Sequence, residues 1–363
     1  MPSLFDPVEL SPVLKLPNRV VMAPLTRGRA TRDAVPTPLM GEYYSQRADA
    51  GLIISEATGI SREGLGWPSA PGLWTDEQVE GWKPVVGAVH EAGGRIVAQL
   101  WHMGRMVHSD VTGTRPLAPS AITPPGEAHT YDGKKPFEEP RAATLDDIAR
   151  VLDDYELAAR NAIAAGFDGV QIHAANGYLI DEFLRETSNR RDDDYGGQIA
   201  NRVRLLREVA QRVVDSIGNE RTGVRLSPNG SVNGADDPNH VALFTEAARA
   251  LEEVGIPWIE MRQPGPQSSF RPTDQEPVSP YMRKVFSGKI GLNSDYDRAS
   301  ALDMVEGGGA DFIAFGRAFL ATPDLVERLR TGAPLNRWDV ETFYSAGPIG
   351  YTDYPTLTEQ AQA

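Results

Sequence analysis

Eight short runs of mostly apolar residues recur along this chain, and amphipathic stretches of helical length separate them. The runs, which are predicted to be strands, cover residues 19–25, 51–57, 95–101, 169–175, 222–228, 257–262, 289–293 and 312–316. Helices are predicted at 37–49, 75–92, 144–165, 198–217, 239–254, 278–286, 295–306 and 322–331. Alternating strands and helices are typical of parallel βα units, whose strands are buried on both faces. Eight such units predict an α/β fold of the (β/α)8, or TIM-barrel, type.

The chain is long enough for one such barrel with additions. Its 363 residues exceed the roughly 250 of a plain barrel, and no stretch has the composition of a linker. We therefore expect a single domain over 1–363, with its core at about 4–354. The segment SPVLKLPNR before the first strand is predicted to form a short N-terminal hairpin that closes the bottom of the barrel. The long intervals 102–143 and 176–197 follow the third and fourth strands, so both belong to the catalytic face.

The formal net charge of −14 and the absence of cysteine narrow the function classes. An acidic chain is a poor partner for nucleic acid or an anionic membrane, and no apolar run reaches the roughly 20 residues of a membrane helix. Without cysteine, thiolate catalysis and cysteine-based metal sites are excluded. The six histidines lack the spacing of a metal motif, so no metal site is expected. With no secretory signal evident at the start, these features predict a cytoplasmic enzyme acting on small molecules.

Unusual residues stand at the carboxyl ends of six predicted strands. In chain order they are Thr26, Ala57, Gln99 with Trp101, His173 with Asn176, Arg225, and Gly316 with Arg317. Because the catalytic groups of a TIM barrel lie at these strand ends, we expect these residues to converge on one site.

The segment His173-Ala-Ala-Asn176-Gly-Tyr178 carries the densest chemistry. His173 and Asn176 can stabilise a developing oxyanion, and the phenol of Tyr178 can donate a proton to a strongly basic carbanion. The alternative is a buried histidine beside a capping asparagine. Three such groups at one barrel mouth favour function over that alternative.

Arginines follow two other strands. Gly316-Arg317 comes directly after the eighth strand, where TIM barrels commonly bind phosphate next to a short helix. The alternative is a helix-capping turn with a surface arginine. Arg225 lies within an apolar strand, where it needs an anionic partner. That partner is either a ligand or a structural acid such as Glu56 or Glu260, and the sequence leaves both open.

Four motifs resemble those of the Old Yellow Enzyme family of FMN-dependent ene-reductases. They are Met22-Ala-Pro-Leu-Thr26, Gln99-Leu-Trp-His-Met-Gly-Arg105, His173-Ala-Ala-Asn176-Gly-Tyr178 and Phe315-Gly-Arg317. The resemblance runs from about Leu4 to Tyr354, and it is strongest to the bacterial branch that includes the N-ethylmaleimide, glycerol trinitrate and 2-cyclohexenone reductases.

The resemblance implies a bound, non-covalent FMN. Pro24, Leu25 and Thr26 would line the isoalloxazine, with Ala57 beside them, Gln99 at the pyrimidine edge and Arg225 at N1/O2. Gly316 and Arg317 would hold the phosphate, with the backbone near Asn293. For the substrate, the resemblance implies that His173 and Asn176 grip its oxygen and that Trp67, Trp101 and Tyr344 shape the pocket. Trp67 departs from the tyrosine that relatives often carry.

The reaction implied is the reduction of activated C=C bonds in enones, enals, maleimides and nitroalkenes, with nitrate esters as a further class. NAD(P)H would reduce FMN, hydride would pass from FMN N5 to the β-carbon, and Tyr178 would protonate the α-carbon. A monomer or weak homodimer is expected, with no nucleic acid or membrane partner. Two alternatives remain at this point: a flavin-free barrel lyase or aldolase, and a non-catalytic ligand-binding barrel.

Overall fold

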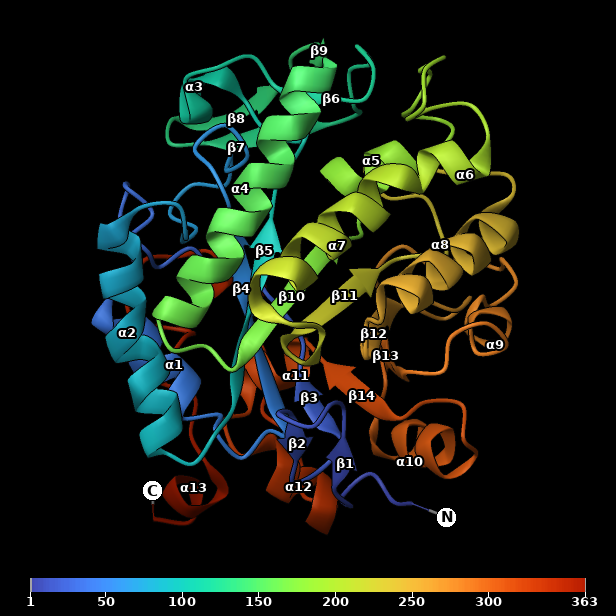
Figure 1. The fold of residues 1–363 in the computed structure, drawn as a ribbon. Coiled ribbons are helices and arrows are strands. Elements are labelled where there is room, and N and C mark those ends of the chain that lie inside the picture. The colour runs from blue at the N-terminus through green and yellow to red at the C-terminus, as the bar shows by residue number, and fades with distance from the viewer. Residues whose placement is uncertain (1, 363) are drawn as a thin grey trace.

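The chain forms a closed barrel of eight parallel strands (Figure 1), described by a computed structural model over residues 2–362. The strands are β3 (Val20–Met22), β4 (Leu52–Gly59), β5 (Ile96–Trp101), β10 (Gly169–Ala174), β11 (Thr222–Leu226), β12 (Trp258–Arg262), β13 (Lys289–Asn293) and β14 (Phe312–Phe315). Each strand pairs with the next barrel strand along the chain, and β14 pairs with β3 to close the ring. The predicted (β/α)8 barrel is confirmed.

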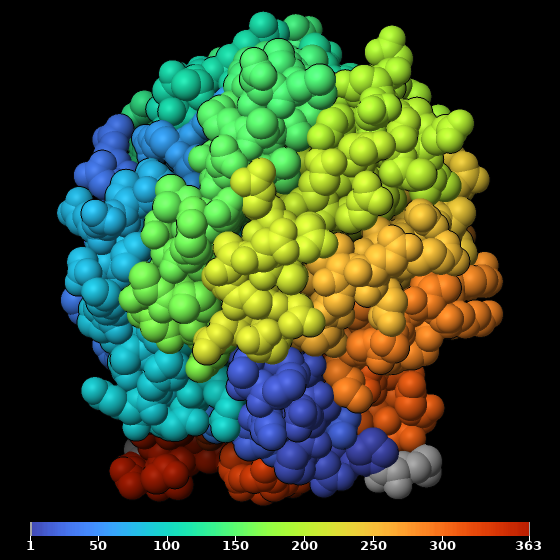
Figure 2. Space-filling model, viewed as in Figure 1, coloured from blue at the N-terminus to red at the C-terminus, as the bar shows by residue number. Residues whose placement is uncertain are grey.

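Helices between the strands form the outer layer. They are α1 (Pro38–Ser45), α2 (Asp76–Glu91), α4 (Leu145–Ala164), α7 (Arg204–Ile217), α8 (His240–Val254), α9 (Ser279–Met282), α10 (Arg298–Glu306) and α12 (Leu325–Thr331). Figure 2 shows the chain colours passing in order from cyan through green and yellow to orange around the outside. This order follows from the packing of α4 against α7 and of α7 against α8.

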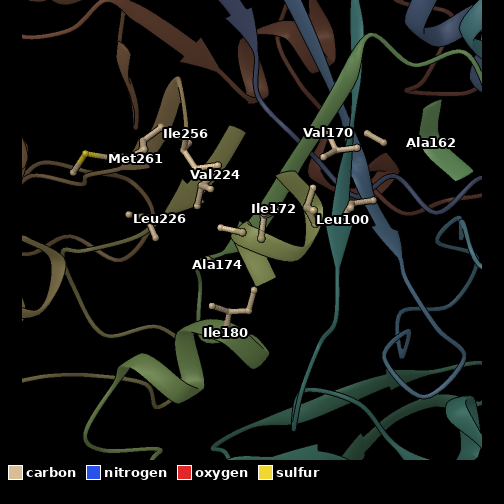
Figure 3. Close-up of a cluster of buried hydrophobic side chains, with 14 of the residues drawn as sticks. Leu100, Ala162, Val170, Ile172, Ala174, Ile180, Val224, Leu226, Ile256 and Met261 are labelled. Carbon is tan, nitrogen blue, oxygen red and sulfur yellow. The ribbon is translucent and has the colours of Figure 1, made fainter. Parts of the chain in front are cut away.

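The strands divide their side chains between two sides of the barrel wall. Val170, Ile172 and Ala174 of β10 pack with Leu100 of β5 and Ala162 of α4 in the apolar layer under the helices (Figure 3). Since side chains alternate along a strand, the intervening Gln171 and His173 must point toward the barrel axis. Every strand can therefore be buried on both faces and still carry polar groups inward.

The barrel interior is apolar near its bottom. Val21, Leu52, Val97, Trp258 and Phe312 pack there with the N-terminal hairpin of β1 (Val8–Glu9) and β2 (Lys15–Leu16). The hairpin thus closes this end, as the sequence predicts.

The predicted insertion 102–143 lies over the opposite end of the barrel (Figure 1). It contains α3 (Ser109–Thr112), the pair β6 (Leu117–Ala118) and β9 (Arg141–Ala142), and the hairpin β7 (Glu127–Thr130) and β8 (Gly133–Pro136). It stands at the carboxyl ends of the strands, which is where the sequence places the site.

Several predicted boundaries were wrong. The helix predicted at 198–217 is divided at Val203 into α6 (Ile199–Arg202) and α7, and the one predicted at 322–331 begins at Leu325. A separate short helix, α11 (Arg317–Ala321), precedes it. Helix α10 begins at Arg298 instead of 295 because Asp297 caps it: the Asp297 carboxylate accepts a hydrogen bond from the Ser300 backbone N–H.

Other elements differ in length or were not predicted. Strand β4 extends to Gly59 with a bulge between Ile54 and Ala57. Helix α13 (Leu357–Gln362) follows Tyr354, and its first backbone N–H donates to the Asp324 carboxylate. No helix within residues 2–362 combines the length and hydrophobicity needed to cross a bilayer.

Candidate active site

The loop after β3 carries Pro24, Leu25 and Thr26 and is held by a buried acid. The Glu56 carboxylate accepts hydrogen bonds from the backbone N–H groups of Arg27 (3.0 Å) and Gly28 (3.1 Å). Leu25 lies beside Gly316, since a Cβ atom added to Gly316 would be 3.6 Å from a methyl group of Leu25. The first and last strands thus bring their loops together, as their pairing in the barrel requires.

Three aromatic rings gather at the ends of β5 and β10. The Tyr178 ring stands edge-on to Trp101 (centroids 4.9 Å apart) and to His173 (5.2 Å), while Trp101 and His173 are nearly parallel at 6.2 Å. Ala57 belongs to the same buried cluster as Trp101. The structure therefore brings together these four residues, which the sequence assigned to one site.

Burial governs the protonation of this cluster. It lowers the pKa of His173 well below its usual value, and the positive charge of Arg225 adds to this effect. It also raises the pKa of Tyr178 above its ordinary range. At neutral pH both groups are therefore uncharged, so the imidazole has one N–H to donate and the phenol keeps its proton.

Asn176 is presented by a strained turn at the end of β10. Asn176 and Gly177 both have left-handed backbones, with φ of 60° and 72°. The Asn176 N–H donates to Ser227 Oγ (2.7 Å), and its carbonyl accepts from Asn233 Nδ2 (2.9 Å). With the backbone held in this way, Oδ1 of Asn176 and Nδ1 of His173 are buried and have no hydrogen-bond partner. Buried polar atoms without partners are rare and require an explanation, of which a bound ligand is one.

Five polar side chains cross the barrel at one level, and we call them the polar layer: Gln99, Gln171, Glu260, Arg225 and Asn293. Gln99 Nε2 donates to Gln171 Oε1 (2.7 Å), and Gln171 Nε2 donates to Glu260 Oε2 (2.8 Å). Arg225 Nε lies 3.2 Å from Glu260 Oε1 in an ion pair without hydrogen-bond geometry. Arg225 Nη2 donates to Asn293 Oδ1 (3.0 Å). Of the two acids that the sequence offered to Arg225, Glu260 is its partner.

Arg317 lies at the start of α11 and forms an ion pair with Asp295 and a hydrogen bond to the hydroxyl of Ser269. Its guanidinium also lies 5.3 Å from the centre of the Trp338 ring. Gly316 and Arg317, which the sequence assigned to phosphate binding, thus both follow the end of β14.

A cavity of about 260 Å³ opens beside this cluster. Trp67 and Tyr178 line it, as do four residues that the sequence did not single out: His129, Phe137, Asn233 and Arg271. Trp101 and Tyr344 do not line it directly, but each contacts a residue that does. The Tyr344 ring lies 4.9 Å from Trp67.

Three further polar residues face the barrel axis. The sequence reasoning missed Gln171 and Arg262, and it named Glu260 only as a possible partner of Arg225. Gln171, Glu260 and Arg262 are all buried on the inward face of the barrel. Arg262 Nη2 donates to the Phe270 carbonyl (2.8 Å), while Nη1 is buried without a partner. A signal was present: Gln171 is two residues before His173, and Glu260 and Arg262 alternate with apolar residues, which is the period of a strand face.

Comparison with known proteins finds relatives over most of the chain. Residues 3–336 match the model of the NADH:flavin oxidoreductase / NADH oxidase family. The Old Yellow Enzyme homologue from Zymomonas mobilis superposes with a TM-score of 0.97 at 57% identity, covering 98% of this chain and all of that one (100%). The chain belongs to the Old Yellow Enzyme family.

Two more relatives of this Old Yellow Enzyme family member span nearly its whole length. Morphinone reductase, solved with tetrahydroNAD, has a TM-score of 0.93 and 44% identity over 98% of both chains. Putative 12-oxophytodienoate reductase 5 of Oryza sativa subsp. japonica is 42% identical, covering 99% of this chain and 96% of the relative. The protein is thus an FMN-dependent oxidoreductase that uses a nicotinamide hydride donor.

The residues present fit a flavin. The polar layer offers amide and guanidinium groups suited to a pyrimidine edge, and Arg225 supplies positive charge. Within residues 2–362, no group of three or more histidine, aspartate or glutamate side chains is arranged to hold a metal ion.

Proposed function

We propose that this enzyme reduces alkenes activated by a carbonyl or nitro group: enones, enals, maleimides and nitroalkenes. The observation that carries the proposal is the group of Tyr178, His173 and Asn176 at the end of β10. Tyr178 lines the cavity and its ring contacts that of His173, and His173 and Asn176 each have a buried polar atom without a partner. A substrate with one electronegative oxygen next to a C=C bond would accept hydrogen bonds from an N–H of the His173 ring and from the NH₂ group of the Asn176 amide. A nitrate ester offers a similar oxygen and is a second substrate class.

His173 and Asn176 would hold the substrate oxygen. Because His173 is neutral, it acts as a hydrogen-bond donor and not as a cation, and its tautomer decides which nitrogen donates. The fixed turn at Asn176 presents its amide without further reorganisation. Donors preorganised in a buried site stabilise charge that develops on the bound oxygen, here an enolate or nitronate.

Tyr178 would deliver the proton to the α-carbon. Its phenol remains protonated at working pH because burial opposes ionisation, and contact with Trp101 and His173 fixes its ring. Trp67, Trp101 and Tyr344 would bound the apolar part of the substrate. Bound FMN supplies the hydride, which it obtains from NADH or NADPH.

The cofactor would contact the loops and the polar layer. Pro24, Leu25, Thr26 and Ala57 would line the ring system, while Gln99 and Arg225 would face its pyrimidine edge. Gly316 and Arg317, next to Asn293, would hold the phosphate. For Arg317 this requires that the phosphate replace or join the Asp295 carboxylate as its partner.

The proposal is tested on the purified protein. We expect yellow protein that releases FMN on denaturation, oxidises NADH or NADPH, and then reduces 2-cyclohexenone, N-ethylmaleimide and a nitroalkene. A flavin-free barrel lyase, or a binding protein without activity, would be colourless. Flavin that turns over with nicotinamide and oxygen but with none of the alkenes would refute the proposed substrate class.

A further inference from the structure

Glu260 is a fully buried carboxylate at the centre of the polar layer. It stands on β12 directly opposite Arg225 on the neighbouring strand β11, and its exposed fraction is 0%. One carboxylate oxygen faces the Arg225 guanidinium at 3.2 Å, and the other accepts the hydrogen bond from Gln171. Glu260 therefore contacts Arg225 with one carboxylate oxygen and Gln171 with the other.

The ion pair makes the charge under the site close to zero. A buried arginine without a counter-ion is strongly unfavourable, and Glu260 provides that counter-ion. Arg225 still influences its surroundings, because its charge helps to lower the pKa of His173. Glu260 thus cancels part of the positive charge of Arg225, and only the remaining charge can act on a bound anion.

Glu260 also sets the direction of the hydrogen bonds. An ionised carboxylate only accepts, so Gln171 must turn its NH₂ toward Glu260 and its carbonyl toward Gln99. Gln99 must then donate to Gln171. The orientation of the Gln99 amide is therefore determined by an acid on another strand.

We propose that Glu260 is a positioning residue that sets the reduction potential of the bound flavin by compensating Arg225. The inference rests on the proposed function, in which Arg225 faces the pyrimidine edge of FMN. The oxidised ring is neutral, whereas the ring that has gained two electrons and one proton carries a negative charge. A positive charge close to the ring favours the reduced form, and a carboxylate beside that charge weakens the effect.

The test is the two-electron midpoint potential of the FMN-loaded protein and its Glu260→Gln variant. The substitution keeps the shape and an acceptor for Gln171 but removes the negative charge. We expect the affinity for reduced FMN over oxidised FMN to rise at least tenfold, which shifts the potential by about +30 mV or more. Arg225→Gln, which leaves Glu260 uncompensated, should shift the potential in the opposite direction.

A double variant and a matched control separate charge from damage. Arg225→Gln combined with Glu260→Gln is neutral again, so its potential should lie between those of the single variants. It leaves no buried charge unpaired, so it should fold even if Glu260→Gln alone does not. Asp237→Asn removes another buried carboxylate, one paired with Arg202, and should leave the potential unchanged.

The outcomes distinguish the inference from the proposed function. If Arg225→Gln lowers the potential and Glu260→Gln does not raise it, the role of Glu260 is refuted and the placement of Arg225 stands. If neither variant changes the potential, Arg225 does not face the flavin and the inference fails with that placement, whereas the proposed alkene reduction is refuted only by the activity assay. A shift in Asp237→Asn as large as that in Glu260→Gln would also overturn the inference.

Discussion

At the scale of single residues, the phenol of Tyr178 is the group whose role can be tested most directly. Tyr178→Phe keeps the edge-on contacts with Trp101 and His173 but removes the proton. Losing a general acid typically costs roughly 10²–10⁴-fold in rate. We therefore expect alkene reduction to slow by that factor while NAD(P)H reduces the flavin at a near-normal rate. Stopped-flow measurement of the two half-reactions checks this, and equal slowing of both would contradict it.

Gln171 supports a second prediction at the same scale. Its amide is the only link between Gln99 and Glu260 that the hydrogen bonds of residues 2–362 provide. Gln171→Leu should leave Gln99 free to turn, at a cost of about 1 kcal/mol for each hydrogen bond lost. We expect FMN to bind roughly tenfold more weakly, as measured by fluorescence titration of the apoprotein. Unchanged FMN affinity would show that Gln99 is not oriented by Gln171.

Much of the candidate site could be predicted from the types of residue at the strand ends. The spacing of residues along the chain predicted less of it. His173, Asn176 and Tyr178 could be chosen because three reactive groups follow one strand. Gln171 could not be chosen in the same way, because it stands inside an apolar run and its partners lie on other strands. Glu260 could be named only as one of two candidate acids for Arg225. Only the barrel register, which sets Arg225 opposite Glu260, shows that these residues interact.

At the scale of elements, two arginines hold the segment that carries Tyr344. Arg29 donates to the carbonyls of Thr342 (2.9 Å) and Phe343 (2.7 Å), and Arg27 donates to that of Gly350 (2.7 Å). Both come from the loop after β3, so the C-terminal segment is attached to the loop that carries Thr26. Through this attachment Tyr344 is kept against Trp67.

Arg29→Met should loosen this segment without touching the flavin contacts. We expect KM for bulky alkenes to change several-fold, faster proteolysis within residues 335–350, and an unchanged rate of flavin reduction. Arg330→Met, which removes an exposed arginine on α12, is the matched control. Wild-type KM together with wild-type proteolysis in Arg29→Met would show that the segment is held by other contacts.

Element boundaries show which local signals were sufficient. Helix α4 begins where the sequence predicts because Thr144 and Asp147 cap it reciprocally. The break at Val203 was not predicted because no glycine or proline marks it. The short helix α11 was not predicted as a separate element, although Gly316 and Pro323 flank it. The insertion was predicted only as a loop, since the pairing of β6 with β9 joins segments more than twenty residues apart.

At the scale of the whole molecule, a buried histidine should make stability depend on pH. His102 lies where the insertion leaves the barrel, against Gly64, with its carbonyl accepting from the Leu179 N–H (3.2 Å). Its Nδ1 accepts from the Gly104 N–H (3.0 Å), and its Nε2 is buried without a partner. Burial lowers the pKa of His102 from 6.5 to about 4.

Between pH 6.5 and about 4, only the unfolded chain binds a proton at His102, so the free energy of unfolding should fall as the pH falls through this range. The difference in pKa corresponds to roughly 3 kcal/mol. His102→Asn keeps an acceptor for Gly104 and should be less stable at pH 7, because the smaller side chain leaves a void. The loss of stability that His102 causes on acidification should, however, be absent from this variant. Urea unfolding of both proteins at several pH values measures the difference, in which the contributions of all other titrating groups cancel. Two stability curves that remain parallel from pH 7 to pH 4 would mean that His102 is protonated as readily in the folded protein as in the unfolded chain.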